Sequence, residues 1–242
     1  MICYIAERWR AEDGYRDFLA IAFPLMLSTA SWSIQLFVDR MFLAWHSSEA
    51  LAASLPAGMT SFVIVAFFLG TAGYVNTFVA QYVGAERSQR VGPSLWQGGY
   101  VALLSALAGL LCAFWSQELF DFVGHEPAVR AKETAYFRIL CYGIFPLVLS
   151  SALSCLYTGR GKTWTVLAVS ACTTVVNIIL SYGLIFGNFG LPDMGIEGAG
   201  WATNIGTLMG TVLYIILLTQ HHYRRDFATM SGWRFDREPV FV

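Results

Sequence analysis

The chain has 242 residues, of which 56% are hydrophobic and only 13% are charged, with a formal net charge of −1 and a mean hydropathy of +0.55. Soluble globular domains carry about 25% charged residues, so this composition excludes an ordinary soluble domain and indicates a protein embedded in membrane lipid. The balanced charge offers no basic surface for nucleic acid, and membrane lipids are the expected surroundings of most side chains.

Long apolar runs recur along the chain, each long enough to cross a bilayer, which takes about 20 helical residues. They predict an all-α membrane protein in which six transmembrane helices form one bundle. A polar segment, 1–17, precedes this six-helix lobe, 18–219, and a basic, aromatic tail, 220–242, follows it. The predicted spans are 18–45, 51–83, 95–115, 135–157, 163–187 and 195–219.

The Lys and Arg residues predict the orientation of these spans. Eleven of the 15 lie in the N-terminal segment, the second and fourth connections and the tail, which all fall on one side. Cytoplasmic loops are enriched in Lys and Arg, so both termini are predicted to be cytoplasmic. Two of the remaining four, Arg40 and Arg138, lie near helix ends, where we expect them to extend toward the outer headgroups.

The first span contains Asp39, an acidic residue deep inside a long apolar run. A carboxylate in hydrocarbon is costly, so such residues face a protein interior or a wet cavity and commonly serve transport. Ser28, Ser31 and Gln35 precede Asp39 at helical spacing and share its face. Fifteen residues before Asp39, Pro24 would free a backbone carbonyl in mid-helix and permit a bend. A hinge is the functional interpretation, and a proline in the first turn is the alternative.

Two later spans carry polar residues on one face. Thr173, Asn177 and Ser181 follow i, i+4, i+8 spacing on the fifth span, and Thr203 begins a similar series on the sixth. Hydroxyl and amide oxygens around one carboxylate suit Na⁺, and they equally suit a network that exchanges a proton. The alternative is that they only form hydrogen bonds between helices.

Several other chemistries find no support in the sequence. Residues 159–163 resemble the end of a phosphate-binding loop, but the glycine required five residues before Gly161 is replaced by Leu156. No nucleophile–base pair or metal cluster is present, so neither an enzyme nor a cofactor is predicted. The cysteines show no paired spacing and are expected to be small core residues; they are Cys3, Cys112, Cys141, Cys155 and Cys172.

Several local patterns, taken in order over almost the whole chain, resemble the N-terminal half of a multidrug and toxic compound extrusion (MATE) transporter. This family belongs to a larger group that includes flippases of lipid-linked oligosaccharides. The patterns are Pro24 with Phe37-Val38-Asp39, Ala80-Gln81-Tyr82-Val83-Gly84-Ala85, Tyr136-Phe137-Arg138-Ile139 with Gly143 and Pro146, Arg160-Gly161-Lys162-Thr163, Asn177 with Leu184-Ile185-Phe186-Gly187, and the run from Met194 to Thr203.

The resemblance implies a secondary transporter of the bacterial cell membrane, with two six-helix lobes around a central cavity. The resemblance further implies that such a transporter exchanges organic cations or other drug-like compounds for H⁺ or Na⁺. The coupling ion would act at Asp39, with Asn177, Ser181 and Thr203 nearby and with Na⁺ bound at Asp39 if sodium is used. The residues expected to line the pocket are Ser31, Gln35, Tyr136 and Thr173.

Two departures from the family pattern limit this reading. Archaeal-type members carry a second aspartate where this chain has Ser181, which favours the NorM-like bacterial branch and leaves Asp39 as the expected sole titratable carboxylate of the lobe. Six spans are half of such a transporter, so a second six-helix lobe is expected from the same gene or a separate chain. A lipid-linked precursor flippase, a non-transporting membrane subunit and a truncated remnant remain alternatives.

Overall fold

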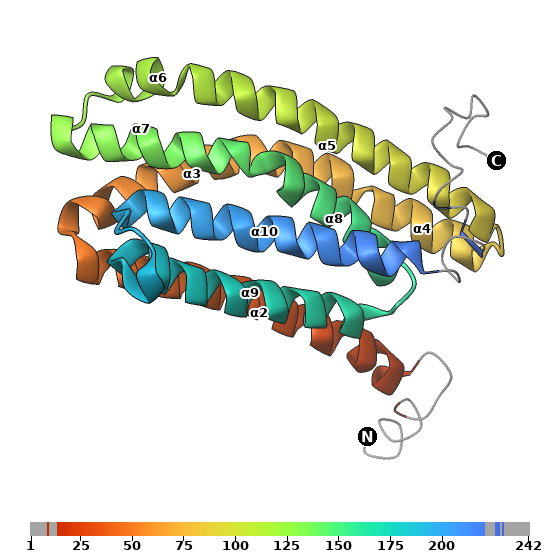
Figure 1. The fold of residues 1–242 in the computed structure, drawn as a ribbon. Coiled ribbons are helices and arrows are strands. Elements are labelled where there is room, and N and C mark those ends of the chain that lie inside the picture. Colours follow the sequence, from red (N-terminus) through yellow and green to blue (C-terminus); the bar gives the residue numbers. More distant parts are fainter. Residues whose placement is uncertain (1–8, 10–13, 221–225, 228, 230–242) are drawn as a thin grey trace, which may run out of the picture.

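The structure is a computed structural model that describes residues 9, 14–220, 226, 227 and 229. Long helices lie side by side along one direction and form a bundle (Figure 1). In chain order they are α2 (Tyr15–His46), α3 (Ser48–Gly73), α4 (Val75–Gly84), α5 (Val91–Phe114), α6 (Ser116–Val123), α7 (Pro127–Tyr142), α8 (Ile144–Thr158), α9 (Thr163–Phe186) and α10 (Gly195–Thr219), with 3₁₀ turns η1 (Ser88–Arg90) and η2 (Asn188–Gly190).

The prediction of an all-helical membrane protein is confirmed. Within the described part of the chain, five helical segments are long and apolar enough to cross a bilayer, and a sixth is obtained when α7 and α8, which meet at an angle of 41°, count as one bent span. The predicted second span corresponds to α3 and α4 together. The predicted segments 1–17 and 220–242 fall largely outside the described residues, although Tyr15 already begins α2.

The bend between α7 and α8 has a clear local cause. The N–H of Gly143 bonds to the Leu140 carbonyl, one residue later than α-helical geometry requires, and Pro146 offers no N–H in the next turn. The carbonyl of Ile139 is therefore released, and it accepts a hydrogen bond of 2.6 Å from Asn204 Nδ2 on α10. A Cβ atom at Gly143 would lie 1.9 Å from Asn204 Oδ1, so the bend requires glycine here.

The connection predicted between the third and fourth spans is wrong in part. Residues 116–132 were expected outside the helices, but they form α6 and the start of α7. The fourth span therefore begins at Pro127 rather than at 135. Proline is well suited to the first position of a helix, because its missing N–H has no partner there. The charged residues that follow hide this start from a search for apolar runs.

Arg138 also differs from its prediction. Its side chain does not extend to the headgroups; its Nε and Nη2 atoms donate hydrogen bonds of 3.2 and 3.1 Å to Ser116 Oγ. Ser116 is fully buried at the start of α6, so this contact ties α6 to α7. The side chain thus holds the two helices together away from the turn that joins them.

The helices pack closely where small residues allow it. Gly206 and Gly210 on α10 face α9, and a Cβ atom at Gly210 would lie 2.7 Å from Thr173 Cγ2. A Cβ atom at Gly206 would meet Asn177 Cβ at 3.4 Å. This arrangement brings the polar face of α9 directly against α10.

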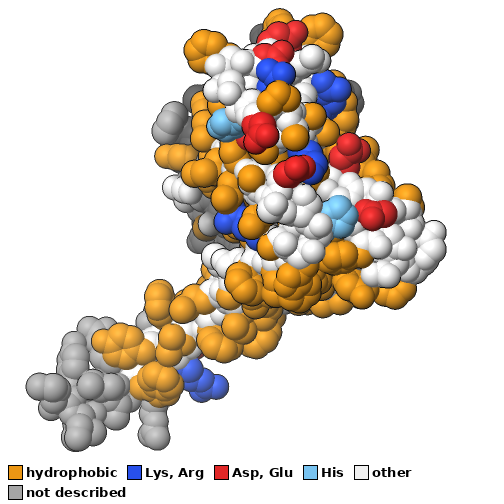
Figure 2. Space-filling model, turned by 90° about the vertical axis from the view of Figure 1, so that its left-hand side faces the viewer, with side chains coloured by type: hydrophobic (Ala, Val, Ile, Leu, Met, Phe, Trp, Pro, Cys, Tyr) orange, Lys and Arg blue, Asp and Glu red, His pale blue; other side chains and the backbone are white. Residues whose placement is uncertain are grey.

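The two ends of the bundle differ in charge. The start of α2 and the end of α10 lie at the same end, on the right in Figure 1. Figure 2 views the opposite end, where acidic, basic and histidine side chains gather within a largely hydrophobic surface. We call the end that holds the α2–α3 turn and the α9–α10 connection the distal end.

Candidate functional site

The polar face predicted for the first span is the surface through which α2 packs on α9. Ser28 Oγ lies 2.6 Å from Ser170 Oγ, and Thr174 Oγ1 donates a hydrogen bond of 3.5 Å to the carbonyl of Ser31. The opposite side of α2 carries many exposed apolar side chains. Because polar side chains in lipid seek partners on neighbouring helices, this face fixes the rotation of α2 about its axis.

Asp39 lies further along the same face and is buried, with 7% of its surface exposed. Its Oδ1 atom accepts a hydrogen bond of 2.6 Å from Ser181 Oγ on α9, and Ser181 is fully buried. A hydroxyl donor at this distance is typical of a strong bond to a carboxylate. Within the part of the chain that the structure describes, no ion pair involves Asp39.

Asn177 is the third member of this cluster. It is fully buried one turn before Ser181, and its side chain also interacts with the Asp39 carboxyl. Its Nδ2 atom donates a hydrogen bond of 3.4 Å to Thr203 Oγ1, which itself donates to the Ala199 carbonyl. Asn177 Oδ1 has no hydrogen-bond partner among the residues that the structure describes. The structure thus brings together the four residues predicted for ion coupling, and it leaves one buried oxygen free to accept a proton donor or a cation.

The residues predicted to line the pocket are more dispersed. Tyr136, on α7, is partly buried and lies close enough to Asp39 for the charge of the carboxylate to act on its hydroxyl. Gln35 lies one turn before Asp39 on α2 and is partly buried. Ser31 lies another turn away, and its Oγ donates to the Leu27 carbonyl within the same helix.

Thr173 and Pro24 lie away from Asp39. Thr173 Oγ1 donates to the Ser170 carbonyl within α9, and its methyl group packs against Gly210, so its side chain belongs to the α9–α10 contact. Pro24 is buried inside α2, nine residues after the helix begins at Tyr15, and is therefore outside the first turn. The helix continues through Pro24 without a break, and the hinge role stays a prediction.

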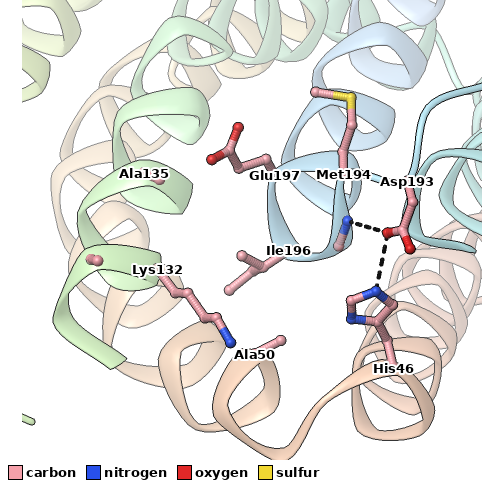
Figure 3. Close-up of a pocket in the computed structure, with 10 residues that line it drawn as sticks. His46, Ala50, Lys132, Ala135, Asp193, Met194, Ile196 and Glu197 are labelled. Carbon is pink, nitrogen blue, oxygen red and sulfur yellow. Dashed lines mark hydrogen bonds and ion pairs between the residues drawn. The ribbon is translucent and has the colours of Figure 1, made fainter. Parts of the chain in front are cut away.

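A pocket of about 510 Å³ opens at the distal end (Figure 3). His46 Nε2 lies 3.1 Å from Asp193 Oδ1, which also accepts a hydrogen bond from the Gly195 N–H. Lys132 and Glu197 face the same hollow from α7 and α10. An apolar cluster lies between the pocket and Asp39 along the helices; its buried members are Phe42, Leu43, Ala50, Ala53, Ile185, Ile196 and Ala199.

Glu133 on α7 corrects the expectation that Asp39 is the only titratable carboxylate in this lobe. Glu133 is fully buried, its Oε1 atom lies 2.8 Å from His125 Nδ1, and its Oε2 atom has no hydrogen-bond partner. Glu133 lies two residues before the predicted start of the fourth span at 135, so the predicted span does not include it. The i, i+4, i+8 spacing of Glu133, Phe137 and Cys141, all buried, was the available signal.

Comparison with known proteins agrees with this architecture. The MatE family model matches residues 24–183. The chain is 27% identical over 221 residues to a probable multidrug resistance protein NorM of Listeria monocytogenes, covering 90% of this chain and 48% of that protein. It is 29% identical over 228 residues to one from Bradyrhizobium diazoefficiens, covering 93% and 48%. The chain thus spans about half the length of the curated relatives it matches.

Two solved structures show the same fold. A multidrug resistance MATE transporter in the outward-facing conformation aligns with a TM-score of 0.76 at 17% identity, over 92% of this chain and 49% of that one. A MATE protein in the straight conformation gives 0.78 at 18% identity, over 96% and 51%. Because the MatE family model covers residues 24–183, more than half of the chain, the chain belongs to the MatE family.

Proposed function

We propose that this chain is one lobe of a cation-coupled antiporter that exports small organic cations or drug-like compounds in exchange for H⁺ or Na⁺. The observation that carries the proposal is Asp39, a buried carboxyl that accepts a hydrogen bond from Ser181 and lies beside Asn177, with no ion pair to any described residue. The proposal is one of transport rather than catalysis, and the multidrug resistance relatives support it.

The coupling follows from the charge of Asp39. An ionised carboxylate buried among neutral groups is costly, so a bound proton or sodium ion would lower the free energy of the conformation that buries it. A conformation that exposes the carboxylate to water would favour release of the ion. The difference in ion affinity between two conformations is what drives an exchange. In this proposal α2 moves relative to α9, and Pro24 is the hinge.

The free oxygen of Asn177 is compatible with either ion. When Asp39 is protonated, its hydroxyl can donate to Asn177 Oδ1, which has no other partner. When Na⁺ is bound instead, the same oxygen can serve as a ligand together with the carboxylate, because sodium prefers oxygen donors. Both uses require Asn177 on α9 to lie close to Asp39 on α2 in the conformation that binds the ion.

We propose further that this lobe works with a second six-helix lobe, since the curated relatives are about twice as long. In this arrangement the protein lies in the bacterial inner membrane with both termini cytoplasmic. The basic residues at the end opposite the distal end support that orientation, since Lys and Arg gather on the cytoplasmic side. They include Arg16, Arg87, Arg90, Arg160 and Lys162.

The test uses proteoliposomes that hold this chain together with its second lobe. Efflux of a fluorescent organic cation is measured after a pH gradient or a Na⁺ gradient is imposed separately. The proposal expects one of the two gradients to drive efflux, and it expects Asp39→Asn to abolish the response while substrate still binds. Gradient-driven efflux that persists in Asp39→Asn would overturn the assignment. Efflux without any ion dependence would overturn the antiport mechanism itself.

A further inference from the structure

Helices α5, α8 and α10 form an apolar groove at the end of the bundle opposite the distal end. Helix α8 packs against both α5 and α10 and provides the floor, through Leu149 and Leu153. Leu95 and Gly99 on α5 form one wall, and Ile215 and Leu218 on α10 form the other. The groove has a volume of about 290 Å³ and is lined almost entirely by apolar groups. Its shape suits a single hydrocarbon chain.

The rim of the groove lies near the ends of its helices. Trp96, in the second turn of α5, donates a hydrogen bond of 2.9 Å from Nε1 to the carbonyl of Thr229. Thr219, the last residue of α10, also lines the groove. Tryptophan is enriched at the boundary between hydrocarbon and headgroups, so the groove opens at headgroup level and runs inward along α8.

Basic residues lie at the same end of the bundle as this opening, next to the helices that form the groove. Arg87 and Arg90 immediately precede α5, and Arg160 and Lys162 lie in the turn that follows α8. The guanidinium of Arg160 lies 4.2 Å from the centre of the Phe227 ring, beside the same end of the bundle. Glu86 and Asp226 are the acidic residues described nearby, so the basic groups exceed them.

We propose that this groove is a binding site for an anionic phospholipid, with one acyl chain between α5 and α10 and the headgroup among the basic residues. The charge complementarity favours an anionic over a zwitterionic lipid, because the basic residues attract a net negative headgroup. Basic sites between membrane helices on the cytoplasmic side are suited to such headgroups. The proposal does not depend on transport, because lipid binding needs only the folded chain in detergent.

The probes are dioleoyl-phosphatidylglycerol and dioleoyl-phosphatidylcholine, added to the purified full chain in detergent. Binding is followed by native mass spectrometry and by the shift of the thermal unfolding temperature. We expect phosphatidylglycerol to bind and to raise the unfolding temperature more than phosphatidylcholine does. In Arg87→Gln and Lys162→Gln we expect its affinity to fall about fivefold for each charge removed.

Gly99→Leu tests the groove itself. A side chain at Gly99 meets nothing within 4 Å, so leucine would occupy the groove without a clash and would compete with the acyl chain. Gly70→Leu on α3 is the matched control, since a side chain there also meets nothing within 4 Å. Arg16→Gln is the charge control, because Arg16 lies at the same end on α2, which does not pack on α5. Both controls should bind phosphatidylglycerol as the unaltered chain does.

Three results would overturn the proposal. Equal binding of the two lipids, unchanged by Arg87→Gln and Lys162→Gln, would exclude a specific anionic site. Stabilisation by inorganic phosphate equal to that by phosphatidylglycerol would identify an anion site that does not use the groove. A Gly99→Leu chain that loses stability to the same extent with and without lipid would show that a segment of protein fills the groove. If Gly99→Leu does not fold, the charge variants still decide the question.

Discussion

The lobe buries two carboxyl groups whose surroundings differ. Asp39 lies where α2 packs on α9, about two turns before α2 ends at His46, and its neighbours are the neutral side chains of Ser181 and Asn177. Glu133 lies near the distal end on α7, where it pairs with His125, a residue that can carry a positive charge. The side chain of His125 is 42% exposed, so this pair communicates with water, whereas Asp39 and Ser181 are both buried.

The two carboxyl groups therefore differ in what can balance their charge: a histidine of the same chain for Glu133, and an exchangeable ion in the role proposed for Asp39. Glu133 can be neutralised by a histidine of the same chain, so its charge can be kept in place as part of the structure. Asp39 has no cationic partner among the described residues, which is the arrangement that the proposed coupling role requires. A carboxyl group of the second kind is suited to coupling, and one of the first kind is suited to holding helices together.

The largest expected effect concerns transport. Asp39→Asn keeps the shape of the side chain but can no longer exchange a proton or pair with Na⁺, so we expect coupled efflux to fall by about a hundredfold or more, as for loss of an essential group. Glu133→Gln should change efflux by less than about threefold, because a structural pair does not take part in the exchange. Initial rates of efflux in proteoliposomes with the second lobe measure both. A reversed result, with Glu133→Gln uncoupled and Asp39→Asn active, would contradict this assignment of roles.

The second expected effect concerns stability, and its sign differs between the two sites. Glu133→Gln removes the charge that pairs with His125 and should lower the free energy of unfolding by about 1–3 kcal/mol. Asp39→Asn removes an uncompensated buried charge and should leave the stability unchanged or raise it by about 1 kcal/mol. Thermal unfolding of each purified chain in detergent gives the comparison. A destabilised Asp39→Asn chain would indicate that Asp39 also has a structural role.

The helices and polar faces around Asp39 could be predicted from the sequence because they depend on helical periodicity. The end of the fifth span was placed one residue beyond α9, and the bounds of the sixth, 195–219, agree with α10. Once helices are assumed, residues three and four positions apart must share a face, so the spacing of Ser31, Gln35 and Asp39 was sufficient to predict a common face on α2. Which side chains would meet, such as Asp39 and Ser181, depends on how the helices pack and was inferred from the family resemblance.

The Glu133 pair could not be found in the same way. An apolar-run criterion rejects a helical turn that contains Arg130, Lys132 and Glu133, although Glu133 is fully buried. Charged residues at the end of a span are compatible with burial when a nearby partner such as His125 exists. That partner lies eight residues away across a turn, and its position depends on the tertiary fold.

The third expected effect distinguishes the two coupling ions. The hydroxyl of Ser181 donates to Asp39, so Ser181→Ala destabilises the ion-free carboxylate. If the ion is H⁺, the H⁺ concentration that gives half-maximal efflux should fall about five- to tenfold. The variant loses a hydrogen bond that stabilises the ionised form of Asp39, so the protonated form is favoured. If the ion is Na⁺ and Ser181 is one of its ligands, the corresponding Na⁺ concentration should rise by a similar factor.

Efflux rates measured over a range of pH and of Na⁺ concentration show whether Ser181→Ala lowers or raises the half-saturating ion concentration. Ser31→Ala is the matched control, since its hydroxyl bonds to the Leu27 carbonyl within α2. We expect Ser31→Ala to match the unaltered chain for both ions. An effect as large as that of Ser181→Ala would mean that changes anywhere on this face of α2 alter ion binding.

The smallest expected effect tests whether burial or pairing with histidine determines how much a carboxylate contributes to stability. His46 and Asp193 form a second histidine–carboxylate pair at the distal end, with Asp193 62% exposed, whereas Glu133 in the first pair is buried. Exposed ion pairs contribute about 0–1 kcal/mol, because water screens the charges and solvates whichever partner remains. Asp193→Asn should therefore lower the free energy of unfolding by less than about 0.5 kcal/mol, well below the effect of Glu133→Gln. Thermal unfolding in detergent compares the two; equal losses would show that pairing with histidine, rather than burial, determines the contribution of Glu133.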